Sequence, residues 1–219
     1  MREGRERTAC LLCRGATAPF FDDHDRAYLR CETCALVFVP PRQHPTPAEE
    51  RERYLWHRNE ADEGYVSHLR RLVDPLTARL RPKTRGLDFG CGPEPVLGRL
   101  LEDDGFPTAS YDPLFRADEA LLTTCYDFIT CSEVLEHLRD PRETLGRLDA
   151  LLAADGVLGV MTRLYDGVDF GSWWYRRDVT HVCFYAADTL RWIADWRGWR
   201  LERPSPDVTL FSRAGAPRG

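Results

Sequence analysis

Apolar positions follow a helical period in the first half of the chain and form short continuous runs in the second half. Between residues 48 and 80 they recur at helical spacing, with Gly64 and Pro75 as interruptions, which predicts two or three helices. The apolar positions at this spacing are Val66, Leu69, Leu72, Val73 and Leu76. The later runs are bounded by turn residues and are typical of buried parallel strands. They cover residues 86–89, 126–131 and 156–162.

Helical patterns separate these strand-like runs. One helix is predicted at 96–105 and another at 141–156, while a third, at 186–198, precedes two further strands at 199–204 and 207–213. Strands that alternate with helices are typical of an α/β protein with a doubly wound, mostly parallel, Rossmann-like sheet. A chain of 219 residues allows one such core plus a small appendage, since a domain has about 150 residues.

Two cysteine pairs near the N-terminus have the spacing of a zinc site. They form the pattern C-x2-C-x17-C-x2-C, in which each two-residue gap makes a tight turn that points both thiolates at one ion, about 2.3 Å away. The four residues are Cys10, Cys13, Cys31 and Cys34. Short strands are expected at 28–30 and 36–39. We predict a ribbon with a closed, structural Zn²⁺ site; the alternative is four unrelated buried cysteines.

Prolines divide the chain after this ribbon. Residues 39–47 contain four prolines, which exclude a helix or a central strand and mark a boundary. We therefore expect a zinc ribbon at 1–45, a helical linker or lid at 46–82 and the main α/β domain at 83–219.

The charge balance and the apolar pattern narrow the function classes. With 30 basic and 35 acidic residues the net charge is -5, which disfavours broad nucleic-acid binding, and the acidic stretch FFDDHDR disfavours it for the ribbon. No apolar run approaches the ~18 residues of a membrane span, and the charged N-terminus lacks a signal-peptide pattern, so we expect a cytoplasmic protein. The remaining cysteines are expected to be small buried apolar residues. They are Cys91, Cys125, Cys131 and Cys183.

A glycine-rich turn follows the first strand of the main domain. The sequence GLDFGCGPEP leads from a strand into a helix, and a second strand then ends at Asp112, 22 residues after Gly90. Glycines let a ligand approach the backbone, and an acid after the second strand accepts hydrogen bonds from ribose hydroxyls, which implies a nucleoside-containing cofactor. Asp88 would repel a pyrophosphate but suits a cationic amino-acid head group, and Pro95 replaces the third glycine of a nicotinamide fingerprint.

The motifs LDFGCG, YDP and CYDFITCSEVLEHL resemble those of class I S-adenosylmethionine-dependent methyltransferases, in particular the group with N-terminal CxxC pairs and a DFGCGPxP turn. The resemblance extends to the ribbon, to the segment around Tyr54, His57 and Tyr65, and to THVCFY. It implies a seven-strand-type sheet closed by an antiparallel hairpin, S-adenosyl-L-methionine as cofactor, and methyl transfer.

The same resemblance implies which residues bind the cofactor. Asp88, Gly90 and Gly92 would line its methionyl end, and Asp112 would hold its ribose. The full implied set is Asp88, Phe89, Gly90, Cys91, Gly92, Asp112, Pro113, Leu114, Cys131 and Ser132.

The chain departs from the family pattern at two places. Glu94 stands where relatives tend to have glycine, and a carboxylate that pointed inward there would repel the methionine carboxylate. Only 13 residues separate Asp112 from Tyr126, too few for the usual helix and third strand, so the adenine contacts are expected near residues 113–115.

Two carboxylates and an imidazole follow the strand at 126–131. A helix from Ser132 to Leu138 would place Glu133, Glu136 and His137 on one face, where they could bind a divalent cation such as Mg²⁺. The pattern resembles that of metal-assisted O-methyltransferases, including those that act on RNA 2'-hydroxyls, and His181 is the candidate fourth ligand. Alternatively, the acids cap the helix and the histidine packs.

An aromatic and basic segment, residues 170–178, lies between the strand at 156–162 and the last helix. Its side chains are expected to wall an acceptor pocket suited to an anionic group, or simply to pack in the core. They are Trp173, Trp174, Tyr175, Arg176 and Arg177. His181, oriented by Asp178, is the candidate general base, with Glu133 as the third catalytic candidate; the alternative is a structural histidine.

These observations predict methyl transfer to a small-molecule acceptor, with oxygen favoured because His181 and the carboxylates can handle a proton. Two alternatives remain open. One is a non-catalytic module that binds the cofactor and docks a protein or RNA through the ribbon, which Glu94 and the missing third strand favour. The other is a metal-assisted RNA 2'-O-methyltransferase.

Overall fold

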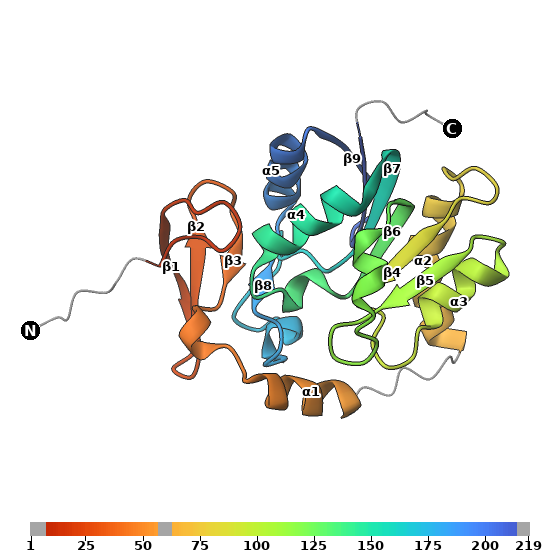
Figure 1. The fold of residues 1–219 in the computed structure, drawn as a ribbon. Coiled ribbons are helices and arrows are strands. Elements are labelled where there is room, and N and C mark those ends of the chain that lie inside the picture. The colour runs from red at the N-terminus through yellow and green to blue at the C-terminus, as the bar shows by residue number, and fades with distance from the viewer. Residues whose placement is uncertain (1–7, 57–62, 214–219) are drawn as a thin grey trace, which may run out of the picture.

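The computed structural model describes residues 8–56 and 63–213, which form a main sheet and a smaller ribbon sheet (Figure 1). The main-sheet strands are β4 (Gly86–Phe89), β5 (Thr108–Tyr111), β6 (Tyr126–Ser132), β7 (Leu152–Met161), β9 (Trp199–Ser205) and β10 (Val208–Arg213). The ribbon-sheet strands are β1 (Thr17–Asp22), β2 (Ala27–Cys31), β3 (Val37–Phe38) and β8 (Cys183–Phe184). The helices are α1 (Pro47–Trp56), α2 (Glu63–Thr77), α3 (Val96–Asp103), α4 (Pro141–Leu151) and α5 (Ala187–Arg197).

The main sheet has six strands in the order β5-β4-β6-β7-β10-β9. The first four are parallel, and β10 is antiparallel to both of its neighbours, so β9 and β10 form the expected hairpin. The main sheet thus has six strands rather than the seven that the family resemblance implies, in agreement with the missing third strand noted in the sequence. The short connection from Asp112 to Tyr126 is the reason, because it holds only the 3₁₀ turn η2 (Glu119–Thr123).

Both faces of this sheet are buried, as the Rossmann-like pattern predicts. Side chains alternate along β6, so that Phe128 packs beneath α2 and α3 while Ile129 joins the core beneath α4 and α5. The two helix pairs lie on opposite sides of the sheet (Figure 1). The sequences of these strands are continuously apolar because side chains on both faces of each strand pack against a layer of helices.

Helix α2 includes both residues that were expected to interrupt it. Gly64 lies in its first turn, and Pro75 lies within its last turns before the end at Thr77. The prediction of a break at Pro75 is wrong because burial outweighs the local cost: the apolar face packs on α3, β7 and β10. The side chains fully buried on that face are Leu69, Leu72, Val73 and Leu76.

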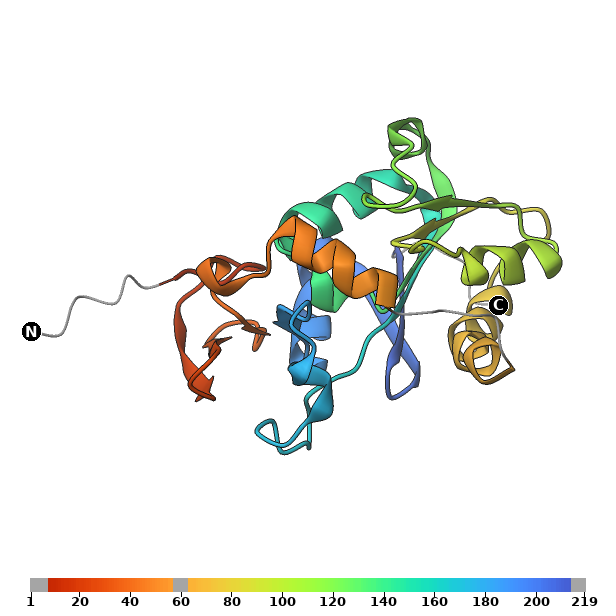
Figure 2. The same ribbon diagram turned by 90° about the horizontal axis from the view of Figure 1, so that it is seen from below.

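The ribbon is joined to the main domain through a shared sheet. Its strands are ordered β1-β2-β3-β8, and the last strand comes from the THVCFY segment near the end of the chain. Buried ribbon residues such as Tyr28 and Phe38 belong to the same core as Leu135 and Phe184. Seen from below, α1 crosses between the ribbon and the main domain (Figure 2). The structure thus packs the ribbon directly against the 170–184 region.

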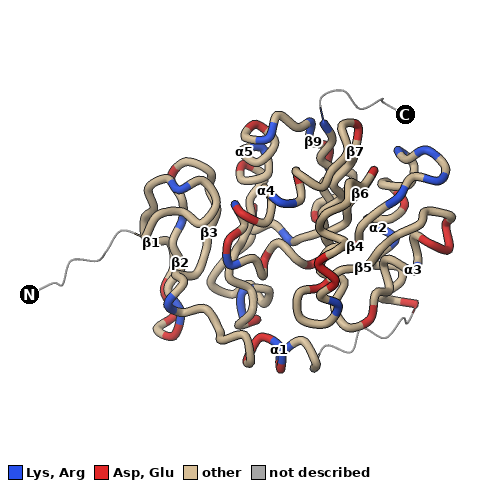
Figure 3. The backbone as a smooth tube through the Cα atoms, in the orientation of Figure 1, with Lys and Arg blue, Asp and Glu red and all other residues tan. Residues whose placement is uncertain are grey.

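The charged residues are spread over the fold, and the four cysteines outside the ribbon differ in burial. Asp/Glu and Lys/Arg positions are interspersed over the fold and do not separate into one basic part (Figure 3). Cys131 and Cys183 are buried as expected, whereas Cys91 is half-buried and Cys125 is exposed, which corrects the expectation for these two. In the described parts of the chain, no helix is both long and apolar enough to cross a membrane.

Candidate active site

A cleft of about 820 Å³ opens at the carboxyl ends of β4, β5 and β6. All of the predicted cofactor-binding residues line this cleft except Cys131, which is fully buried within β6. The exception follows from the strand's pleat, since successive side chains point to opposite faces. The cleft also receives Tyr54 from α1 and Tyr65 from α2, while His57 lies outside the described residues.

Asp112 connects two turns that line the cleft, the glycine turn after β4 and the turn after β5. Its Oδ2 accepts a hydrogen bond from the Gly92 amide at 2.9 Å, and its Oδ1 accepts from the amides of Leu114 and Phe115 at 2.8 and 3.1 Å. Gly90 must be glycine here, because its φ is +79° and an added Cβ would lie 2.5 Å from Val134 Cγ2. The glycine turn is therefore fixed by backbone bonds to one carboxylate.

Asp88 is a buried carboxyl at the end of β4. It is 3% exposed, and its Oδ1 accepts a hydrogen bond from the Thr130 hydroxyl at 3.0 Å. Burial raises the pKa of Asp88 to about 7, because desolvation outweighs the bonds from Thr130 and from the Gly98 amide. A cation placed beside this group would favour its ionised form.

Glu94 does not bury its charge at the glycine turn. Its carboxylate is more than half exposed and forms an ion pair with Arg99 of α3 at 3.1 Å. Helix α3 begins after Pro95 without a side-chain cap; the Val96 amide donates to the Glu94 carbonyl, and the Gly98 amide donates to Asp88. The Glu94 carboxylate is therefore paired with Arg99 and does not place an unpaired negative charge in the glycine turn.

The segment after β6 is not the predicted α-helix. It contains only the 3₁₀ turn η3 (Leu135–His137), and Glu133 adopts a left-handed φ of +52° before it. The short connection to α4, which Asp140 caps, leaves no room for a longer helix. As a result, Glu133 and Glu136 do not share a helix face but meet at the Tyr175 hydroxyl.

Tyr175 links the two carboxylates. Its hydroxyl lies 3.0 Å from Glu133 Oε2 and 2.5 Å from Glu136 Oε1, and Glu136 Oε2 accepts from the Thr162 hydroxyl at 2.9 Å. Burial and the neighbouring Glu133 raise the pKa of Glu136 well above its usual range. Because one hydroxyl hydrogen serves two carboxylates, we infer that Glu136 holds a proton.

Two histidines present the same edge to the cleft. His181 Nδ1 lies 2.7 Å from the Tyr175 carbonyl and His137 Nδ1 lies 3.1 Å from the Thr180 carbonyl, so each Nδ1 donates and each Nε2 is left as acceptor. Their rings are 4.7 Å apart. Burial lowers the pKa of His181 to about 3, so this imidazole is neutral at pH 7.

Asp178 does not orient His181, which corrects the predicted pairing. The carboxylate of Asp178 accepts hydrogen bonds from Arg53 of α1 and from the Thr180 hydroxyl. The carbonyl of Tyr175 orients the imidazole instead. Arg53 was not predicted, although its place beside Glu50 and Tyr54 on one polar face of α1 was a visible signal.

Two groups of residues have suitable metal-ligand atoms that lie close to one another. In the ribbon, one Sγ from each of Cys10, Cys13, Cys31 and Cys34 lies within 4.8 Å of the others, and backbone amides donate to three of them. This donor set fits a tetrahedral Zn²⁺. Beside the cleft, one potential ligand atom from each of Glu136, His137 and His181 also lies within 4.8 Å of the others. Glu133 is not part of this group.

The aromatic and basic segment is divided between the cleft and the ribbon. Trp174, Tyr175 and Arg177 line the cleft as predicted. Trp173 and Arg176 do not: Arg176 forms an ion pair with Asp23 of the ribbon, and Trp173 borders a second pocket. The short turn η4 (Trp174–Arg177) rotates successive side chains to different sides, so a contiguous run cannot face one pocket.

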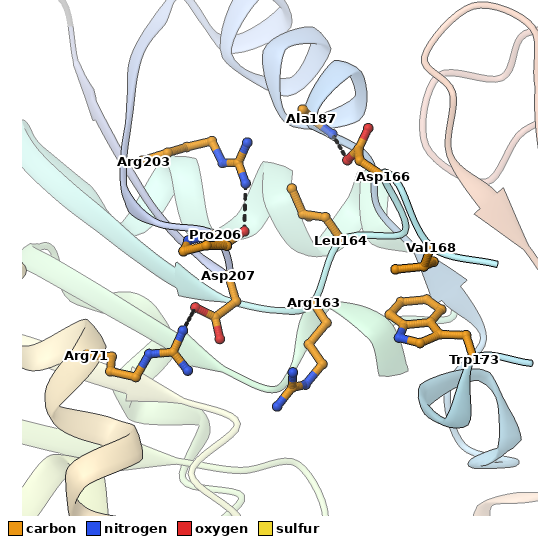
Figure 4. Close-up of a pocket in the computed structure, with 10 residues that line it drawn as sticks. All are labelled: Arg71, Arg163, Leu164, Asp166, Val168, Trp173, Ala187, Arg203, Pro206 and Asp207. Carbon is orange, nitrogen blue, oxygen red and sulfur yellow. Dashed lines mark hydrogen bonds and ion pairs between the residues drawn. The ribbon is translucent and has the colours of Figure 1, made fainter. Parts of the chain in front are cut away.

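The second pocket measures about 400 Å³ and lies beside the β9–β10 turn (Figure 4). Arg71 pairs there with Asp207, and Arg203 donates to the Pro206 carbonyl. Arg163 follows β7 and lies 5.0 Å from the ring of Trp174, which reaches the main cleft. The arginines of this pocket are thus mostly engaged within the protein.

Comparison with known proteins identifies related sequences and folds. A family profile described as a methyltransferase domain matches residues 56–203. No curated protein matches the chain. Among solved structures, a 1,6-didemethyltoxoflavin N1-methyltransferase from Burkholderia thailandensis, with bound S-adenosylhomocysteine, has a TM-score of 0.57 at 15% identity and covers 89% of this chain and 98% of its own.

Two further solved structures are similar. Magnesium protoporphyrin IX methyltransferase from Synechocystis PCC 6803, also with bound S-adenosylhomocysteine, has a TM-score of 0.51 at 15% identity, over 77% of this chain and 95% of its own. An O-methyltransferase family protein from Burkholderia thailandensis has a TM-score of 0.51 at 15% identity, over 77% and 64%. At these identities the likeness shows a shared fold.

Proposed function

The chain belongs to the methyltransferase domain family and is an S-adenosylmethionine-dependent enzyme, and we propose that it methylates a hydroxyl group of a small-molecule acceptor in the cleft at the ends of β4–β6. The observation that carries the choice of a hydroxyl is the orientation of His181: its Nδ1 is held by the Tyr175 carbonyl, and its Nε2, which has no hydrogen-bond partner among the described residues, is left as an acceptor at the cleft.

The residues of the cleft fit the cofactor. Asp88 and the turn around Gly90 and Gly92 would hold the methionyl end, Asp112 the ribose, and residues 113–115 the adenine side. Gly92 has open space where a Cβ would stand, so its backbone leaves room for a ligand. When bound, S-adenosylmethionine supplies a methyl group activated by the positive charge on sulfur.

The chain itself aligns the acceptor and takes its proton. Tyr175 and Trp174 line the same cleft as the glycine turn, where they would position an acceptor ring or chain. Because burial lowers the pKa of His181 to about 3, its Nε2 would accept the proton as the O–CH3 bond forms, when the alkylated oxygen becomes strongly acidic. The nearby carboxylate of Glu133, which is held by Tyr175, would stabilise the resulting imidazolium. Alignment of two reactants can by itself lower the barrier of such a displacement by about 7–11 kcal/mol.

Changing His181 to alanine tests this role. We expect turnover to fall about 100-fold, as for loss of a general base, while cofactor affinity stays within about threefold. Formation of S-adenosylhomocysteine would be followed by mass spectrometry against a panel of small phenols and alcohols, and binding by calorimetry. His24→Ala, in an exposed turn of the ribbon, is the matched control. Equal loss of binding and turnover in His181→Ala would contradict the assignment.

Cofactor binding is expected to depend on pH through Asp88. Its folded-state pKa is about 7, so the carboxyl is neutral below that pH and ionised above it. A cationic ligand favours the ionised form, so affinity for S-adenosylmethionine should fall by up to about tenfold per pH unit below 7. Calorimetry at pH 6, 7 and 8 measures this, and Asp88→Asn should remove the dependence.

The stability of the apoprotein provides an independent control on the same residue. A raised pKa means that ionised Asp88 destabilises the fold above the unfolded-state pKa, and fully so above pH 7. Asp88→Asn should therefore unfold at a higher temperature than the wild type at pH 8, and at a similar temperature at pH 4. A pH-independent affinity in the wild type would exclude Asp88 from the cationic end.

A second candidate function uses a divalent cation to activate the acceptor. The proximity of Glu136, His137 and His181 favours it, because both Nδ1 atoms are held by backbone carbonyls and neither Nε2 atom has a hydrogen-bond partner within residues 8–56 and 63–213. In the same turnover assay, this function predicts activity that is lost on treatment with a chelator and restored by Mg²⁺, with the zinc content unchanged. RNA with a free 3'-terminal 2'-hydroxyl belongs in the acceptor panel.

A further inference from the structure

Arg26, in the turn between β1 and β2 of the ribbon, binds the backbone of the segment that ends at His181. Its Nη1 donates to the carbonyls of Arg176 and Asp178 at 3.3 and 3.1 Å. Its Nη2 donates to the carbonyls of Val179 and His181 at 3.3 and 2.8 Å. One planar guanidinium thus holds four carbonyl groups in a fixed arrangement.

A second arginine, Arg176, extends from this segment to the ribbon. Arg176 forms an ion pair with Asp23, and it also donates to the carbonyls of Phe170 and Gly171 in its own segment. Asp23 in turn accepts a hydrogen bond from the backbone amide of Arg26 at 2.8 Å. The Arg176 side chain is 11% exposed, so this pair is shielded from solvent. The two arginines interlock the ribbon turn with residues 170–181.

The other side of the same segment faces the cleft. Trp174, Tyr175, Arg177 and His181 line it, and the carbonyl of Tyr175 orients the imidazole of His181. The His181 carbonyl is bound by Arg26. Little regular structure holds this stretch: it has one 3₁₀ turn, and the strand β8 that follows is two residues long. Among the described residues, the carbonyls of Val179 and His181 accept hydrogen bonds from Arg26 alone, whereas the Asp178 carbonyl also accepts from the His181 amide.

We propose that Arg26 is a positioning residue, through which the ribbon sets the conformation of residues 176–181 on the acceptor side of the cleft. The inference deepens the proposed function, because it assigns the ribbon a part in acceptor turnover. The residues expected to hold the cofactor lie on β4–β6 and their loops, and Arg26 has no hydrogen bond or ion pair to them among the described residues. Loss of Arg26 therefore affects acceptor turnover and leaves cofactor binding unchanged.

Hydrogen exchange tests the conformation without requiring an acceptor. In Arg26→Ala, amides of residues 176–182 should exchange at least about 10-fold faster, since four bonds to a charged donor are lost. Arg26→Lys should recover part of the protection, because an ammonium can reach only some of the four carbonyls. Arg14→Ala is the matched control, since Arg14 also joins the ribbon to the main domain, through Asp140, but forms no hydrogen bond or ion pair with residues 170–182 in the described part of the chain.

Kinetics and binding separate positioning from a general loss of structure. Arg26→Ala should retain zinc and bind S-adenosylmethionine within about twofold of the wild type, while kcat for an acceptor falls at least about 10-fold. Unchanged amide exchange at residues 176–182 in Arg26→Ala would overturn the proposal. It would also be overturned if amide exchange in β4–β6 increased as much as at 176–182 and cofactor binding were lost. If Arg26→Ala does not fold, Arg26→Lys and Asp23→Asn serve instead. Absence of turnover in the wild type would refute the proposed function, not the exchange result.

Discussion

Replacing Asp112 with alanine is expected to raise the dissociation constant of S-adenosylmethionine more than about 100-fold. The carboxylate is the common acceptor for the amides of Gly92, Leu114 and Phe115, so its removal leaves three backbone donors without their partner and loosens both turns of the cleft floor. It also removes the group proposed to bind the ribose. Calorimetric titration measures the affinity.

Thermal unfolding separates the two consequences of this change. We expect Asp112→Ala to lose about 1–3 kcal/mol of stability, which a folded protein of this size tolerates. Asp118→Ala is the matched control, because Asp118 also accepts a backbone amide at a turn but does not line the cleft. Unchanged affinity in Asp112→Ala would exclude this aspartate from the cofactor site.

Replacing Cys34 with serine is expected to release zinc and to lower the unfolding temperature by more than about 10 °C. The four thiols lie within 4.8 Å of one another, and the adjacent ribbon residues, such as Leu12, Val37 and Phe38, are fully buried. Without the ion, four close sulfur atoms cannot all ionise, and the two C-x2-C turns lose the ion that joins them. Native mass spectrometry and calorimetry measure the two effects.

The control for this prediction is Cys125→Ser, because Cys125 is exposed and lies far along the chain from both C-x2-C turns. It should keep one zinc and the wild-type unfolding temperature. Wild-type stability in Cys34→Ser, with zinc still bound at one ion per chain, would show that the four cysteines do not form the site.

Several elements could be predicted because local signals specify them. The apolar runs at Gly86–Phe89 and Tyr126–Ser132 form parallel strands, since alternate side chains enter two apolar layers. The glycine turn and Asp112 come together because both follow neighbouring parallel strands, whose carboxyl ends meet at one edge of the sheet.

Other predictions failed where contacts between distant segments decide the outcome. Pro75 stays inside α2 because the helix gains more from burial of its apolar face than the proline costs. Arg176 was assigned to the acceptor pocket, but Asp23, which is 153 residues away in the sequence, draws it to the ribbon. No local pattern encodes such a partner.

The amino-acid sequence by itself determined the α/β class, the glycine turn with its two aspartates, and the close set of four cysteines, because each depends on periodicity or on spacing within one segment. Only the tertiary structure decided which edge of His181 faces the cleft, that Tyr175 joins Glu133 to Glu136, and that the ribbon grips residues 176–181. The physical reason is that hydrogen bonds to backbone carbonyls are chemically identical along the chain, so their pairing follows from packing rather than from residue type.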